Sequence, residues 1–174
     1  MKQEYGLVVW LTGLAGSGKS TIGRALYQHL RQRIKHIVYL DGDEFRELFE
    51  SFGYDRSARV EVSRKRSKLC SFLSSQGIIV IASTVSLYQE IYKLNRANMP
   101  NYLEIYVQCD LQELIQRDQK GLYTQALNGE TSNVVGVDIP FDEPQADLII
   151  QNHTKEQLES NIQRILEQIK EKIQ

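Results

Sequence analysis

Eight consecutive residues, 13 to 20, constrain the fold of this chain most: they read Gly-Leu-Ala-Gly-Ser-Gly-Lys-Ser. Glycines followed by a lysine and a serine at this spacing are typical of a phosphate-binding loop. The loop follows a continuously apolar run, 7–11, and precedes a stretch, 19–35, whose apolar residues recur at helical spacing. A strand, a glycine-rich turn and a helix in this order predict an α/β fold that binds a nucleoside triphosphate.

Each part of the loop suits an anionic ligand. The glycines allow backbone N–H groups to turn toward phosphate oxygens, and the N-terminus of the following helix adds a favourable dipole. Lys19 can neutralise charge on the β- and γ-phosphates, and the hydroxyl of Ser20 can bind Mg²⁺. The predicted phosphate-binding residues are Gly13, Leu14, Ala15, Gly16, Ser17, Gly18, Lys19 and Ser20, with Ser20 as the metal ligand.

Short apolar runs alternate with helical patterns along the rest of the chain. Further strands are predicted at 37–40, 78–82, 102–107 and 148–150, and helices at 57–75, 86–97, 111–117 and 158–173, with a short helix ending at Phe49. This alternation requires crossover connections and a parallel sheet covered by helices on both faces. With 174 residues, 41% of them hydrophobic, we expect one P-loop NTPase domain with a five-stranded sheet over residues 1–174.

The segment 119–147 breaks the alternation. It contains Pro140 and Pro144 and several glycines, and it is too long for an ordinary connection between a helix and a strand. We predict that it forms a mobile flap over the bound ligand.

Two carboxylates follow the second predicted strand, in the sequence Asp41-Gly42-Asp43. Ligands of open α/β sheets bind at the carboxyl ends of the strands. Beside a magnesium nucleotide, such carboxylates can orient metal-bound water and accept a proton from an attacking hydroxyl. Asp43 also precedes a helical stretch, so a helix N-cap is the alternative role for it.

The loop alone does not distinguish a motor, a GTP-dependent switch and a small-molecule kinase. The chain contains no Asn-Lys-x-Asp motif of the kind that reads guanine, and it is short for a motor. These observations favour a compact kinase.

Four motifs together resemble the adenylylsulfate kinase family. They are the loop at 13–20, Leu-Asp-Gly-Asp-x-x-Arg ending at Arg46, Lys-Gly-Leu-Tyr at 120–123 and Gly-Val-Asp-x-Pro-Phe-x-x-Pro at 136–144. The resemblance extends from about residue 5 to 150. It implies that the chain, with ATP and Mg²⁺ as cofactors, transfers a phosphoryl group to a ribose 3′-hydroxyl of a small nucleotide.

The resemblance also implies roles for individual residues. Asp41 corresponds to the proposed general base, and Lys120 to a flap lysine that approaches the phosphates. Arg46 and Arg59 match two arginines that bind the anionic group of the acceptor, a task that suits a planar guanidinium. The resulting catalytic candidates are Asp41, Lys19 and Lys120; the substrate-binding candidates are Asp41, Asp43, Arg46, Tyr54, Arg59, Ser86, Lys120 and Val134; Thr21 and Arg117 complete the nucleotide-binding set.

Departures from the family pattern lie on the acceptor side. The family holds the acceptor's adenine between two phenylalanines, at positions that are Tyr54 and Val134 here, and a family asparagine is replaced by Val62. The family's Ser-Phe-Ile-Ser-Pro-Tyr-Arg reads Ser-Thr-Val-Ser-Leu-Tyr-Gln at 83–89. Adenylylsulfate is the first predicted acceptor. The alternative is cytidine diphosphoramidate, the acceptor of a capsule-associated branch of the family, and a non-catalytic nucleotide-binding regulator is a third hypothesis.

Net charge, apolar runs and cysteine content limit the kinds of partner and the location that we expect. The net charge is −1, which predicts no nucleic-acid partner bound through bulk charge, and no apolar run approaches the ~20 residues of a membrane span. Without a signal peptide or a disulfide pattern, a cytoplasmic location is expected. The C-terminal apolar stripe is predicted to pack on the sheet, with a homodimer helix as the alternative. The basic run 64–68 is predicted to be a solvated helix face, with anion binding as its alternative.

Overall fold

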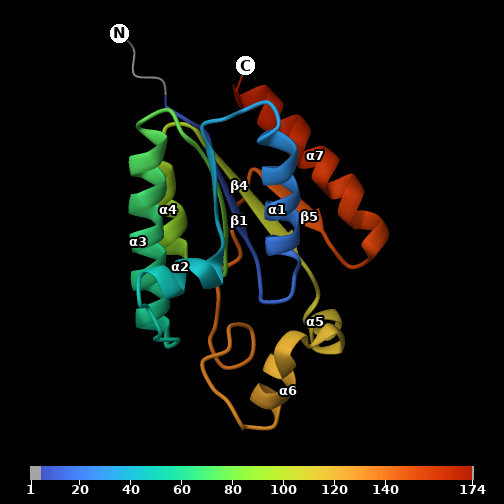
Figure 1. Ribbon diagram of the computed structural model, residues 1–174. Helices are drawn as coiled ribbons and strands as arrows, with labels where there is room; N and C mark the ends of the chain where they lie inside the picture. The colour runs from blue at the N-terminus through green and yellow to red at the C-terminus, as the bar shows by residue number, and fades with distance from the viewer. Residues whose placement is uncertain (1–4, 174) are drawn as a thin grey trace.

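A five-stranded parallel sheet forms the centre of the molecule, in the strand order β2-β3-β1-β4-β5 (Figure 1). The computed structural model describes residues 5–173. The strands are β1 (Val8–Thr12), β2 (Ile37–Leu40), β3 (Ile79–Thr84), β4 (Tyr102–Gln108) and β5 (Leu148–Gln151). The predicted α/β class, the five strands and their parallel arrangement are confirmed.

Helices cover both faces of this sheet. Helices α1 and α7 lie on one face and α3 and α4 on the other, whereas α5 and α6 lie beyond the carboxyl ends of the strands (Figure 1). The helices are α1 (Lys19–Leu30), α2 (Gly42–Leu48), α3 (Arg56–Ser74), α4 (Gln89–Asn98), α5 (Leu111–Arg117), α6 (Leu122–Leu127) and α7 (Lys155–Ile173), with a 3₁₀ turn at Gln119–Gly121.

Apolar side chains pack on each side of the central strand β1, all of whose residues are buried. On one side, Ile22 of α1 and Ile165 of α7 pack with strand residues in a single cluster. On the other side, Trp10, Cys70 and Ile91 form a second cluster with α3 and α4. The predicted packing of the C-terminal stripe on the sheet is confirmed for Ile162, Ile165, Leu166 and Ile169, which are buried there, whereas Ile173 is exposed.

Several predicted boundaries were wrong. Helix α1 ends at Leu30 rather than at residue 35, and α4 begins at Gln89 rather than at residue 86. Strand β3 continues two residues past Ala82, because Ser83 and Thr84 keep their parallel pairing with β1 although they are polar. The buried face of α3 is largely polar, because Ser63, Arg66, Ser67 and Ser74 lie on it.

The segment 119–147 is more structured than a flap sequence with so many turn residues suggests. It contains α6, and its apolar side chains, including Tyr123, Val134 and Ile139, form a third cluster with Leu14 and Leu114 at the carboxyl ends of the strands. The segment therefore packs against the phosphate loop.

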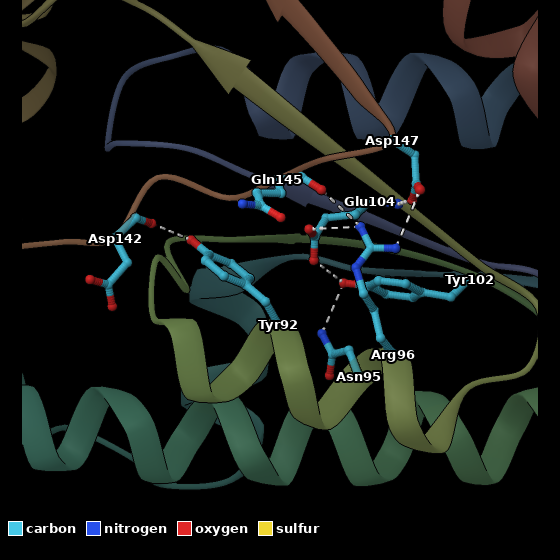
Figure 2. Close-up of polar contacts among 8 residues, drawn as sticks. All are labelled: Tyr92, Asn95, Arg96, Tyr102, Glu104, Asp142, Gln145 and Asp147. Carbon is cyan, nitrogen blue, oxygen red and sulfur yellow. Dashed lines mark hydrogen bonds and ion pairs between the residues drawn. The ribbon is translucent and has the colours of Figure 1, made fainter.

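A network of ion pairs and hydrogen bonds, which we call the anchoring network, holds the end of this segment to the sheet (Figure 2). Arg96 of α4 pairs with buried Glu104 of β4 at 3.1 Å and with Asp147 at 3.3 Å. The Tyr102 hydroxyl donates to the second carboxylate oxygen of Glu104 at 2.7 Å and accepts a bond from Asn95. Burial raises the pKa of Glu104, although the hydrogen bond from Tyr102 and the charge of Arg96 oppose this shift.

Among the described residues, no helix is long and apolar enough to cross a membrane.

Candidate active site

The phosphate loop connects β1 to α1, and its backbone shape depends on two glycines. Gly16 and Gly18 have φ angles of +81° and +98°, a region that residues with a Cβ rarely adopt. Gly18 is the N-cap of α1, so the first N–H groups of that helix point out of the loop. The loop therefore has the form that a phosphate group requires.

Lys19 is buried at the start of α1. Its ammonium group donates to the Leu14 carbonyl at 2.6 Å and to the Ser17 hydroxyl at 3.3 Å. Burial lowers the pKa of Lys19 to about 8, although the negative charges of Asp41 and Asp43 oppose the shift. The lysine is thus a desolvated cation next to the phosphate loop, and a bound anion would stabilise its charged form.

Asp41 lies at the carboxyl end of β2 and is the N-cap of α2. Its carboxylate accepts hydrogen bonds from the Asp43 backbone N–H at 3.0 Å and from the Tyr39 hydroxyl at 2.9 Å. Burial alone would raise the pKa of Asp41, but hydrogen bonds from Ser20, the Asp43 N–H and Tyr39 lower it overall. Asp41 is therefore held ionised and oriented. The alternative role predicted for Asp43, helix capping, was wrong because Asp41 performs it.

A cavity of about 290 Å³ lies over the phosphate loop, and we call it the phosphate cavity. Its lining includes Lys19, Ser20, Asp41, Asp43 and Lys120. Lys120 comes from the segment 119–147 and pairs with Asp43 at 3.4 Å, with both side chains exposed. The structure thus brings the predicted lysines and carboxylates of three separate segments into one place.

A second cavity, of about 520 Å³, adjoins the first, and we call it the acceptor cavity. The two cavities share the lining residues Ala15, Gly42, Asp43, Thr84, Val85 and Leu122. The acceptor cavity is further lined by residues of α2, α3, the connection between them and the segment 119–147, among them Arg46, Tyr54, Val62 and Val134. A molecule in this cavity would therefore lie next to Asp41 and the phosphate loop.

Two predicted arginines line the acceptor cavity, and both lie against the ring of Tyr54. The guanidinium carbon of Arg46 is 4.6 Å from the ring centroid, and that of Arg59 is 5.4 Å from it. Arg46 donates to the carbonyls of Ser51 and Gly53, at 2.9 and 2.8 Å. Arg59 donates to the Tyr54 carbonyl and, at 2.7 Å, to the carbonyl of Asn133 in the segment 119–147.

The comparisons with known proteins agree with this architecture. A family model described as adenylylsulphate kinase matches residues 5–151. The chain belongs to the adenylylsulphate kinase family. The cytidine diphosphoramidate kinase of Campylobacter jejuni is 54% identical over 162 residues, which cover 93% of this chain and 95% of that protein. The adenylyl-sulfate kinase of Gloeothece citriformis is 36% identical over 170 residues, 97% of this chain and 96% of that one.

A solved structure gives the same result at the level of the fold. The Mycobacterium tuberculosis APS kinase CysC in complex with AMPPNP and APS matches with a TM-score of 0.85 and 29% identity, over 94% of this chain and 96% of that chain. This protein is therefore a kinase of the adenylylsulphate kinase family, whose members use ATP, and the predicted family and enzyme class are confirmed.

The remaining predicted site residues, Thr21, Arg117 and Ser86, differ in their burial and in their contact with the site. Thr21 is exposed on the first turn of α1. Arg117 of α5 donates to the carbonyl of Gly16 in the phosphate loop at 3.4 Å, and to those of Asn152 and His153. Ser86 is not part of the cavity lining: it is fully buried, within 2.8 Å of the Thr84 hydroxyl.

Sequence reasoning missed two residues at the kinase site. The Tyr39 hydroxyl binds Asp41, and only alternation within a short strand could have placed it there. Arg66 was included in the predicted solvated face 64–68, and for this residue the prediction was wrong, because its side chain is buried and lines the acceptor cavity. The other basic residues of the run, Arg64, Lys65 and Lys68, are exposed as predicted. Its helical position, four residues after Val62 and four before Cys70, is on the buried face of α3, which is the signal that could have revealed it.

Proposed function

We propose that this kinase transfers the γ-phosphoryl group of ATP to the ribose 3′-hydroxyl of cytidine diphosphoramidate. The acceptor cavity carries the proposal, because Tyr54 is the one aromatic residue among the described residues of its lining and Val134 contributes only an aliphatic side chain. A base stacked on an aromatic side chain gains roughly 1–3 kcal/mol. A cavity with a single ring therefore retains less preference for a large purine. The 54% identity to a cytidine diphosphoramidate kinase supports the same acceptor.

In the proposed reaction, Asp41 accepts the proton of the attacking hydroxyl. The hydrogen bonds from Tyr39 and from the Asp43 N–H orient its carboxylate toward the phosphate cavity, which both Asp41 and Lys19 line. Lys19 and Lys120 stabilise the charge of the transferring phosphoryl group. Asp43 contributes by pairing with Lys120 of the segment 119–147 at the edge of the phosphate cavity.

Magnesium fits the oxygen donors beside the loop. Mg²⁺ prefers oxygen ligands and is commonly held by one or two protein groups together with substrate phosphates. The Ser20 hydroxyl is exposed in the phosphate cavity and forms a hydrogen bond with Asp41. No group of three or more His, Cys, Asp or Glu residues that could hold a metal occurs within residues 5–173, so the phosphates would supply the other ligands. The ion would neutralise phosphate charge, with Ser20 as its protein ligand.

The remaining roles follow the lining of the two cavities. Arg46 and Arg59 bind the anhydride of the acceptor, and Tyr54 stacks on its base. Ser86 acts on the acceptor only through Thr84, whose hydroxyl it contacts. Arg117 and Thr21 support the nucleotide beside the loop. A cytoplasmic location agrees with the supply of ATP and with two free cysteines.

Adenylylsulfate is the second candidate acceptor, because the matching family model and several relatives are adenylylsulfate kinases. A coupled assay with ATP and each acceptor decides between them. We expect a higher kcat/KM for cytidine diphosphoramidate, and Val134→Phe is expected to shift the ratio toward adenylylsulfate by roughly 5- to 150-fold, the equivalent of one added stacking contact. A strong wild-type preference for adenylylsulfate that Val134→Phe leaves unchanged would contradict the proposal.

A further inference from the structure

Arg66 is a buried arginine whose hydrogen-bonding capacity the protein uses only in part. Its side chain is 2% exposed, and a guanidinium carries five N–H donors. Among the described residues, the Thr84 hydroxyl and the Gly42 carbonyl are its acceptors, the second at 3.3 Å. The Nε atom is buried without a partner. Buried donors normally have partners, so the unused donors of Arg66 require an explanation.

The charge of Arg66 is also unpaired within the described chain. No acidic side chain there lies within ion-pair distance of it, in contrast to Arg96 and Arg117, which each pair with a carboxylate. The guanidinium packs on the ring of Phe45, with its central carbon 4.4 Å from the centroid. A buried, unpaired charge costs free energy, and that cost is offset when a ligand supplies acceptors.

The position of Arg66 indicates which ligand that is. Arg66 lines the acceptor cavity together with Tyr54 and Val134, the two residues where the family holds the base of its acceptor. The two terminal nitrogens of the guanidinium donate to the Thr84 hydroxyl and to the Gly42 carbonyl, which positions the group in the cavity lining. Thr84 stands where the family has a phenylalanine, so the hydroxyl that holds Arg66 is part of the altered acceptor side of this chain.

We propose that Arg66 determines base specificity by donating hydrogen bonds to O2 and N3 of the cytosine of the acceptor. This inference rests on the proposed function. A guanidinium is a donor only, and cytosine presents two adjacent acceptors at O2 and N3. Adenine presents its N6 amino donor next to N1, so it would place a donor against a donor. Uracil has a donor at N3 and would lose one of the two bonds.

The test compares Arg66→Met with Arg66→Lys, using affinities for CMP, UMP and AMP and kcat/KM for cytidine diphosphoramidate and adenylylsulfate. A bidentate arginine–base contact discriminates between bases by roughly 5- to 150-fold. Arg66→Met should reduce the preference for cytidine over adenosine by that factor, and Arg66→Lys should recover only part of it. The affinity for ATP reports on the phosphate cavity and should stay at the wild-type value. An unchanged ATP affinity therefore shows that the variants are folded.

Lys65→Met is the matched control. Lys65 is one residue away on α3, but it is exposed and pairs with Glu61 outside both cavities. The substitution Lys65→Met removes a positive charge from the same helix and should leave the ratio of kcat/KM for cytidine and adenosine acceptors unchanged. A change in this ratio equal to that of Arg66→Met would show a general charge effect and overturn the assignment.

A modified substrate tests the same contact without a variant. Replacing CMP with 3-deaza-CMP removes the N3 acceptor, and wild-type affinity should fall while that of Arg66→Met does not. Equal losses for cytidine and adenosine acceptors in Arg66→Met would overturn the inference, because they assign Arg66 to the shared ribose or anhydride. A wild-type preference for adenylylsulfate contradicts the proposed function itself. A cytidine preference that survives Arg66→Met contradicts only the role of Arg66.

Discussion

Two arginines, Arg96 and Arg66, lie on neighbouring helices that cover the same face of the sheet, and the protein treats them differently. Arg96 in the anchoring network meets two carboxylates and the Gln145 carbonyl, and the buried Glu104 beside it binds Tyr102 as well (Figure 2). Arg66 lies deeper in the structure, yet it meets one hydroxyl and one carbonyl and no carboxylate of the described chain.

This difference indicates that the charge of Arg96 stabilises the fold, whereas the charge of Arg66 is available to bind a ligand. The anchoring network satisfies its own donors and acceptors and ties the segment 142–147 to β4, so its removal should affect folding. Arg66 has two hydrogen bonds and the Phe45 ring but no ionic partner among the described residues. Replacing it with an apolar side chain therefore removes an uncompensated buried charge and should cost little stability. The two sites should therefore respond in opposite ways to the same substitution.

The largest expected effect is on catalysis, at a charged residue that, like Arg66, lies next to the ligand cavities. Asp41→Asn should reduce turnover by about 10²-fold or more, because an amide cannot act as the general base. Asparagine is as good a helix N-cap as aspartate, so α2 and the free energy of unfolding should change little. Steady-state kinetics and thermal unfolding measure the two quantities. If ATP affinity is lost while turnover at saturation stays normal, Asp41 is a metal-site residue and the base is another group.

Arg96→Met and Arg66→Met test the comparison directly. Arg96→Met leaves Glu104 buried without its cation, which should lower the free energy of unfolding by about 1–3 kcal/mol. Each kcal/mol corresponds to roughly 2–4 °C in Tm for a chain of this size. Arg66→Met should leave Tm unchanged or higher. Denaturant and thermal unfolding measure both variants, with Lys65→Met as the surface reference. Equal destabilisation by the two arginine variants would contradict the distinction between them.

The smallest expected effect is the pH dependence of ATP binding. The pKa of Lys19 is about 8 in the folded protein, below its ordinary value of 10.5, so the lysine is partly neutral near pH 8. Bound phosphate favours the charged form, so ATP binding should take up protons near pH 8, and affinity should fall by less than about tenfold per pH unit above it. The folded state holds this proton less tightly than the unfolded state, so the contribution of Lys19 to stability increases with pH between 8 and 10.5.

Calorimetry in buffers of different ionisation enthalpy measures the proton uptake on ATP binding. Lys19→Arg is the control, because arginine stays charged throughout this range. Proton uptake that is unchanged in Lys19→Arg would assign the effect to another group.

Local sequence determined the donor side of this protein. The loop 13–20, the strand before it and the helix after it are contiguous, so their spacing alone predicted both their structure and the ligand they suit. The apolar runs likewise predicted all five strands, and β1, β3 and β4 are buried along nearly their whole length, as is usual for strands covered on both faces of a parallel sheet. The sequence also predicted that Asp41 and Asp43 follow β2 directly, where ligands of such sheets bind.

Only the tertiary structure decided which groups surround the buried charges. Arg66 was read as part of an exposed basic run, because three cations within three residues are usually solvated; its burial depends on contacts with Thr84 and Gly42, 18 and 24 residues away. The ion pairs of Arg96 with Glu104 and Asp147 likewise depend on the packed fold, because they form only when β4 and β5 lie side by side. Hydrophobic periodicity reports which face of an element is buried, but the partner of a buried charge comes from a distant part of the chain that only the packed fold brings near.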